Sequence, residues 1–253
     1  MSTELTELVK PVLSPVLSGD EFLADVKASS RQTDEFHLWW LGQSGFLLQW
    51  NGRHLLFDPY LSDSLTKKYA ATDKPHVRMT EIVVDPARLD FIDVATSTHN
   101  HTDHLDHETL LPLMAANPNL KLVIPEANLA FAADRLKCDA DWFVGSDDGE
   151  TVKLGEFEIT GLAAAHEEIE FDEEGRCTHL GYVVRFGDFT IYHAGDNKGF
   201  DGMAEELLAA ADGRKIDVAL LPINGRKPEP SQRAVEDAVE QRVELAVEES
   251  ENH

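Results

Sequence analysis

The sequence predicts one mixed α/β domain, in which β-sheets pack together and helices cover their outer faces. Short strand-like runs of apolar residues recur along the chain from His37. Segments with apolar residues at helical spacing separate many of these runs, and neither a fixed-period repeat nor a low-complexity linker is present. With 253 residues, the chain is long enough for a single domain spanning 1–253 with a substantial core.

The first part of the chain predicts a lead-in, a group of strands and a loop. Residues 1–35 are expected to form an amphipathic lead-in, with apolar residues at helical spacing. Strands are expected at 37–42, 46–50 and 54–58. Asn51-Gly52 separates the last two, and this dipeptide is the strongest short hairpin signal. Residues 58–65 then leave the sheet as a loop whose direction is set by Pro59.

The rest of the chain predicts strands interleaved with helices. Apolar runs typical of strands lie at 91–97, 121–125, 150–154, 157–166, 178–186, 188–196 and 216–223. Amphipathic segments typical of helices lie at 107–118, 126–137 and 203–211. Residues 228–253 form a strongly acidic tail with valines at four-residue steps, which predicts a surface helix and nothing resembling a strand.

Composition argues against two classes of partner. The formal net charge is -25 at pH 7, and so negative a surface repels phosphate backbones and anionic lipid. The chain has no run of about 18 apolar residues, and its acidic start is unlike a signal peptide. Cys138 and Cys177 lie far apart, so we expect two reduced, buried thiols. We therefore expect a cytoplasmic protein whose partner is a small molecule, with no nucleic acid and no membrane.

The most informative stretch is T-H-N-H-T-D-H-L-D, residues 98–106, directly after an expected strand. In an extended segment alternate side chains point the same way, so His99 and His101 converge on one point. Asp103 and His104 face a second point close by. Imidazole and carboxylate are ligands of borderline divalent ions such as Zn²⁺. The segment is suited to hold two ions, or one ion with polar neighbours; a histidine-rich surface loop is the alternative.

Further candidate ligands lie at the ends of later strands. His166 closes the apolar run 157–166, and Asp196 ends the run 188–196, where its two oxygens are able to bridge two ions. Either residue alone is more typical of a structural role. Together with the histidine cluster, both are candidate ligands.

Several segments resemble motifs of a known superfamily. H-N-H-T-D-H, the A-A-A-H ending at His166 and the G-D of H-A-G-D-N are similar to successive metal motifs of the metallo-β-lactamase fold superfamily. W-W-L-G-Q-S-G-F-L-L, L-L-F-D-P-Y-L-S-D and L-L-P-I-N-G-R resemble its branch that contains L-ascorbate-6-phosphate lactonase. The resemblance runs from His37 to Lys227. It implies an αββα sandwich of the α+β class, with two mixed sheets, helices on the outer faces and metals at one edge between the sheets.

The resemblance also implies a role for each matching residue. The implied ligands of the first ion are His99, His101 and His166, and those of the second are Asp103, His104 and the bridging Asp196. Asp58 would accept a hydrogen bond from a ligand imidazole and orient it. The implied reaction is hydrolysis by a metal-bound hydroxide, with Asp103 positioning the water or accepting its proton. The cofactor would be Zn²⁺ or Mn²⁺, one or two ions per chain.

One ligand of the family has no match. The fold normally supplies another histidine to the second ion on a strand after P-I-N-G-R, but after Lys227 only His253 follows. We therefore expect tight binding at the first site, weak or absent occupancy of the second, and an atypical C-terminal part at 228–253. A truncated, a frame-shifted and a divergent end are all open alternatives.

Weaker candidates surround this set. Asn224 and Arg226 follow the last apolar strand, and a guanidinium there is a candidate for a substrate phosphate or carboxylate. His193 either lines the site or turns into the core. The remaining candidates are expected to be a solvated histidine, acidic loop residues and packing residues: His107, Glu167 with Glu168, and Trp39 with Trp40.

These residues predict a metal-dependent hydrolase acting on a small ester or lactone, phosphorylated or not. A phosphodiesterase of the same fold is the alternative, because T-H-N-H also resembles the phospholipase D branch and the same ligands serve phosphoryl esters. A metal-binding homologue with impaired catalysis is the third. A homo-oligomer is expected only by analogy with the resembled branch.

Overall fold

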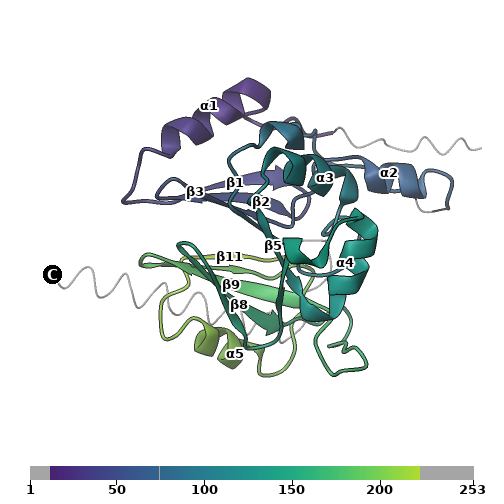
Figure 1. The fold of residues 1–253 in the computed structure, drawn as a ribbon, viewed down its shortest axis with the longest axis vertical. Helices are drawn as coiled ribbons and strands as arrows, with labels where there is room; N and C mark the ends of the chain where they lie inside the picture. Colours follow the sequence, from purple (N-terminus) through teal and green to yellow (C-terminus); the bar gives the residue numbers. More distant parts are fainter. Residues whose placement is uncertain (1–11, 74, 223–253) are drawn as a thin grey trace, which may run out of the picture.

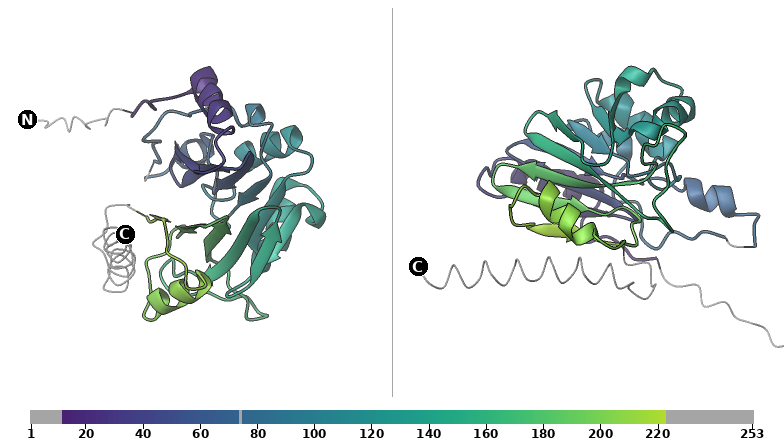
Figure 2. Two further views of the ribbon diagram at one scale, coloured as in Figure 1. Left: turned by 90° about the vertical axis from the view of Figure 1, so that its left-hand side faces the viewer. Right: turned by 90° about the horizontal axis from the view of Figure 1, so that it is seen from below.

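The computed structural model describes residues 12–73 and 75–222 and contains two β-sheets packed face to face, with helices on the outside (Figure 1, Figure 2). The αββα sandwich expected from the sequence is confirmed. Within the described residues, no helix has the length and apolar character needed to cross a membrane. The first part of the expected lead-in and the acidic tail 228–253 lie outside the described residues.

The first sheet has six strands in the order β1-β2-β3-β4-β5-β6. Their bounds are β1 His37–Gly42, β2 Gly45–Trp50, β3 Arg53–Phe57, β4 Val94–Thr96, β5 Lys121–Pro125 and β6 Phe143–Ser146. Strands β1 to β3 pair antiparallel and β3 to β6 pair parallel, so the sheet is mixed. The predicted hairpin joins β2 to β3. Asn51 and Gly52 both have positive φ, +50° and +72°, as the favoured two-residue turn requires.

The second sheet has five strands in the order β11-β10-β9-β8-β7. Their bounds are β7 Thr151–Leu154, β8 Phe157–Ala163, β9 Leu180–Phe186, β10 Phe189–His193 and β11 Val218–Leu220. The sheet is antiparallel from β7 to β10, and β11 joins β10 in parallel. All five were expected, although several are shorter than the apolar runs that predicted them.

Helices cover the outer face of each sheet (Figure 1). Their bounds are α1 Gly19–Ser29, α2 Ser64–Tyr69, α3 His107–Ala116, α4 Leu129–Leu136 and α5 Met203–Ala210, with single turns at Pro86–Arg88, Glu126–Asn128 and Ala140–Trp142. Two elements differ from expectation. The end of the predicted loop 58–65 opens α2, and β6 was not predicted, because both are too short to show a clear period.

Three layers of apolar side chains hold the sandwich together. Phe22 of α1 and Leu110 of α3 pack against the outer face of the first sheet. Leu55 and Tyr182 belong to the central layer between the sheets. Leu207 of α5 covers the outer face of the second sheet. The central layer buries both inner faces, so the loops at the sheet edge rest on a rigid scaffold.

Loops from both sheets meet at one edge of the sandwich. The chain leaves β4 towards the histidine cluster, and β8 and β10 end at the same edge. A backbone bond from Leu180 N to Thr98 O, 2.9 Å long, ties the start of β9 to the segment after β4. The Tyr182 hydroxyl donates to Ser97 O at 3.1 Å and adds a second tie. The topology therefore places the candidate residues that follow β4, β8 and β10 next to one another.

Candidate metal centre

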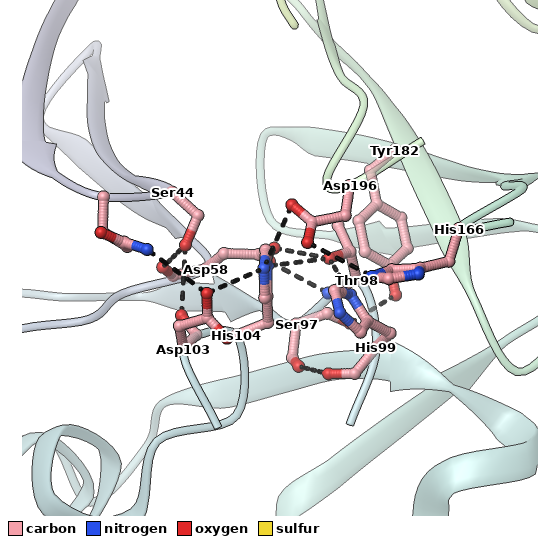
Figure 3. Close-up of polar contacts among 11 residues, drawn as sticks. Ser44, Asp58, Ser97, Thr98, His99, Asp103, His104, His166, Tyr182 and Asp196 are labelled. Atoms are coloured by element: carbon pink, nitrogen blue, oxygen red, sulfur yellow. Dashed lines mark hydrogen bonds and ion pairs between the residues drawn. The ribbon is translucent and has the colours of Figure 1, made fainter. Parts of the chain in front are cut away.

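Four of the predicted ligands meet at this edge of the sandwich. Figure 3 shows three of them, His99, His166 and Asp196. Ligand atoms of His99, His101, His166 and Asp196 all lie within 4.8 Å of one another. The His101 ring centroid lies 4.4 Å from that of His99 and 4.9 Å from that of His166. The first set of ligands named from the sequence is thus assembled in space, with His99 buried and His101 exposed.

The remaining two predicted ligands lie beside this set. His104 Nε2 is 3.7 Å from Asp103 Oδ2 and 3.4 Å from Asp196 Oδ1. The other oxygen of Asp196, Oδ2, lies 3.6 Å from His166 Nε2. Asp196 therefore presents one oxygen to each set, which is the placement a bridging carboxylate needs.

Asp58 forms hydrogen bonds with two residues of the cluster, Thr98 and His104. Its carboxylate is fully buried and accepts from Thr98 N at 2.9 Å and from the Thr98 hydroxyl at 2.5 Å. Asp58 Oδ2 also lies 2.5 Å from His104 Nδ1. An ionised carboxylate only accepts, so Nδ1 of His104 carries a proton and donates it to Asp58. Nε2 of His104 is thereby directed at Asp103 and Asp196.

The donor set fits a divalent cation. His99 Nε2 and His104 Nε2 are buried without a hydrogen-bond partner, and an unsatisfied buried polar atom costs about 1–3 kcal/mol. Burial, followed by the nearby imidazole of His104, lowers the pKa of His99 well below its usual value. His99 is therefore neutral at pH 7, which is the form that binds a metal.

The carboxylates and imidazoles of the centre shift one another's pKa values. Burial alone would raise the pKa of Asp196, but the His104 and His166 imidazoles hold it well below its usual range. Burial alone would lower the pKa of His104, but Asp196 and Asp58 raise it well above its usual value. A cation at this set would therefore displace a proton from His104, so its binding weakens as the pH falls.

Residues that sequence reasoning did not name also reach the centre. His179 stacks on His99, with ring centroids 4.8 Å apart. Gln43 Nε2 donates to Asp103 Oδ2 at 3.4 Å, and the Ser44 hydroxyl donates to Asp103 O at 3.1 Å. The only sequence signal for His179 is that the dipeptide Thr178-His179 repeats Thr98-His99. For Gln43 and Ser44 the sequence predicts only a turn between two strands.

The weaker candidates fall in different places. His193 is 3% exposed and its ring packs 5.1 Å from that of Phe57, which favours the core alternative. His107 is exposed, as expected. Trp40 is 52% exposed, so the expected packing role is wrong for this residue; its Nε1 donates to Gln43 O instead.

Asn224 and Arg226 lie outside the described residues. Both cysteines are free, with Cys177 buried and Cys138 half-buried.

Gly195 allows the Asp196 loop to approach the cluster, and Gly195→Ala is expected to weaken metal binding. Gly195 has φ +57°, and a Cβ there would lie 2.6 Å from the Thr98 hydroxyl oxygen. The backbone strain alone costs roughly 1–2 kcal/mol, and the clash displaces the side chain that contacts His99 and His104. Thermal unfolding and metal titration of the variant check this. Gly155→Ala is the control, since its φ is also positive and nothing lies within 4 Å of the added Cβ.

The chain is similar to a known protein family and to several known proteins. The model of the beta-lactamase superfamily domain matches residues 37–246. A UPF0173 metal-dependent hydrolase from Caldivirga maquilingensis is 32% identical over 194 residues, covering 75% of this chain and 70% of that protein. Another from Saccharolobus solfataricus is 26% identical over 191 residues, covering 74% and 71%.

Among solved structures, CmlA, a diiron β-hydroxylase from Streptomyces venezuelae, superposes with a TM-score of 0.57 at 22% identity. The match covers 83% of this chain, which spans 44% of the length of CmlA. At this identity the likeness concerns the fold alone. The family model covers most of the sequence, and the relatives named above are metal-dependent hydrolases. The chain therefore belongs to the metallo-β-lactamase superfamily, among its metal-dependent hydrolases.

Proposed function

We propose that this chain hydrolyses a small ester or lactone at the centre formed by His99, His101, His166, Asp103, His104 and Asp196. The observation that carries the proposal is the position of Asp196. Its two oxygens face His166 on one side and His104 on the other, at 3.6 and 3.4 Å. Two adjacent sets of acceptors with unpartnered buried imidazole nitrogens suit a hydrolytic metal centre.

The residues divide the work of the reaction. These residues would hold Zn²⁺ or Mn²⁺, which would lower the pKa of a water molecule and polarise the carbonyl of the substrate. The Asp103 carboxylate accepts a hydrogen bond from the Gln43 amide. We assign it the role of orienting the attacking water and accepting its proton. Asp58 keeps the His104 ring in one orientation and one tautomer. Arg226 and Asn224, which follow β11 in the sequence, remain candidates for binding an anionic group of the substrate.

Charge and family resemblance support a small substrate. The net charge of -25 repels polynucleotides and other polyanions. The flanking motifs resemble the lactonase branch, which favours a lactone or ester over a phosphodiester. A panel comparing small lactones and carboxylic esters with a chromogenic phosphodiester tests this. We expect turnover of a lactone or ester; turnover of the phosphodiester alone would contradict the proposal.

Metal analysis gives a test that needs no substrate. Three imidazoles face the first position, but the described residues bring only His104 to the second. We therefore expect one firmly bound ion per chain and a second that is held weakly. His101→Ala is expected to lose the firm ion, because one of those three imidazoles is removed. His107→Ala, which changes an exposed histidine at the start of α3, is expected to keep it. Two firmly held ions, or a firm ion that survives His101→Ala, would overturn this assignment.

A further inference from the structure

His179 is a histidine beside the centre that has no role in the reaction described above. Its ring centroid lies 4.8, 5.9 and 5.6 Å from those of His99, His101 and His166. These distances resemble those within the triad formed by His99, His101 and His166. There the ring centroids lie 4.4 Å apart for 99–101, 4.9 Å for 101–166 and 5.7 Å for 99–166. His179 directly precedes β9, and its carbonyl accepts from Ala164 N at 3.1 Å, just beyond the end of β8. The ring thus belongs to the same sheet edge as the predicted ligands.

The hydrogen bonds of Thr178 fix the tautomer of His179. The Thr178 hydroxyl donates its one proton to Glu170 O at 3.2 Å. Its oxygen is therefore the acceptor in the 2.9 Å contact with His179 Nδ1, which carries the ring proton. Nε2 is left with a lone pair, and this atom is buried without a hydrogen-bond partner.

His99 is held in the same way. The Thr98 hydroxyl donates to Asp58 Oδ2 and lies 3.1 Å from His99 Nδ1, while His99 Nε2 is buried and unpartnered. Two Thr-His dipeptides from different sheets, 98–99 and 178–179, therefore each present an unprotonated Nε2. In His99 this nitrogen is a predicted metal ligand. The matching arrangement of His179 points to the same use.

The space between these rings suits a cation better than a water molecule. A narrow cavity is lined by His99, His166, His179 and Asp196 together with Thr98, Ala164, Leu180 and Asn197. The side-chain donors of Thr98 and Asn197 are already engaged, on Asp58 and on Tyr192. The cavity is too narrow to hold a water. A cation that binds imidazole nitrogen at about 2.0–2.1 Å satisfies such lone pairs in little space.

We propose that His179 is a further imidazole ligand of the first ion, which rests on the metal centre of the proposed function. His179 is not among the four residues whose ligand atoms lie within 4.8 Å of one another, so metal binding draws its ring inward. A set rich in imidazole selects borderline ions over ions that prefer oxygen. The first position therefore selects Zn²⁺ over Mn²⁺.

Cadmium NMR tests the ligand directly and without a substrate. The full chain, with isotope-labelled histidine rings, is loaded with an NMR-active cadmium isotope, and the ring nitrogens coupled to the metal are counted. We expect coupling to Nε2 of His179 in addition to the three ligands of the triad. In His179→Phe that coupling disappears and the other three remain, whereas His107→Phe keeps all of them. Coupling to the triad without His179 would overturn the proposal.

Zinc affinity gives a second measurement. Loss of a residue that only hydrogen-bonds a metal ligand typically weakens metal binding by ~10- to 100-fold. His179→Phe removes a ligand itself, so we expect it to weaken Zn²⁺ binding by at least that much and to lower the preference for Zn²⁺ over Mn²⁺. Thr178→Val keeps the ring but frees its tautomer, so a smaller loss is expected. Unchanged zinc affinity in both variants would overturn the proposal. Cadmium coupling to His179 in a protein that hydrolyses no ester would leave the ligand standing and overturn only the proposed function.

Discussion

Asp196→Ala is expected to abolish firm metal binding and to lower kcat/KM by about 10³-fold or more. One oxygen of Asp196 lies 3.4 Å from His104 Nε2 and the other 3.6 Å from His166 Nε2, so a single substitution removes a ligand from both sets. The ion contributes several kcal/mol to the transition state, and about 4 kcal/mol corresponds to about 10³ in rate. Metal content and kcat/KM on an ester of the panel measure the effect.

The control for this substitution is Asp188→Ala. Asp188 lies in the exposed turn between β9 and β10, whereas Asp196 follows the other end of β10. Replacement of Asp188 by alanine likewise removes one carboxylate. We expect wild-type metal content and activity from it. If both variants lose activity equally, the effect comes from charge or folding rather than from the ligand. If Asp196→Ala keeps its metal, the bridging role is wrong.

Local spacing explains why much of the centre was predictable. His99, His101, Asp103 and His104 lie within six consecutive residues, so their convergence follows from the backbone of one short segment. The strands were predictable because burial of their inner faces leaves continuous apolar runs. His166 and Asp196 became candidates only in combination with the histidine cluster, since a lone histidine or aspartate at a strand end is usually structural.

The contacts that sequence reasoning missed depend on how distant segments fold together. His179 reaches His99 because β9 begins at the edge where β4 ends, and nothing in residues 178–186 predicts that pairing. Gln43 is left-handed, with φ +54°, and this turn conformation carries its amide to Asp103. Trp40 was expected to pack but is exposed, because β1 is the edge strand of its sheet.

Asp58→Asn is expected to weaken binding at the second set of ligands by about 10- to 100-fold while largely preserving the fold. Asp58 has φ +38°, a left-handed conformation that asparagine tolerates well, so the backbone is not newly strained. The amide oxygen still accepts from Thr98 N. The amide nitrogen then faces His104 Nδ1 and donates to it, which moves the ring proton to Nε2. A protonated Nε2 has no lone pair for a metal.

Metal titration that resolves the two binding steps separates this effect from general damage. Asp93→Asn is the matched control, because the Asp93 carboxylate likewise accepts from a backbone amide, His54 N at 2.9 Å, but away from the centre. We expect both steps unchanged there. Asp58→Ala, by contrast, removes both buried oxygens that accept from Thr98 and His104, so we expect it to lose stability as well as metal. If Asp58→Asn binds both ions normally, His104 Nε2 is not a ligand, and Asp58 acts only by holding Thr98 and the loop that follows it.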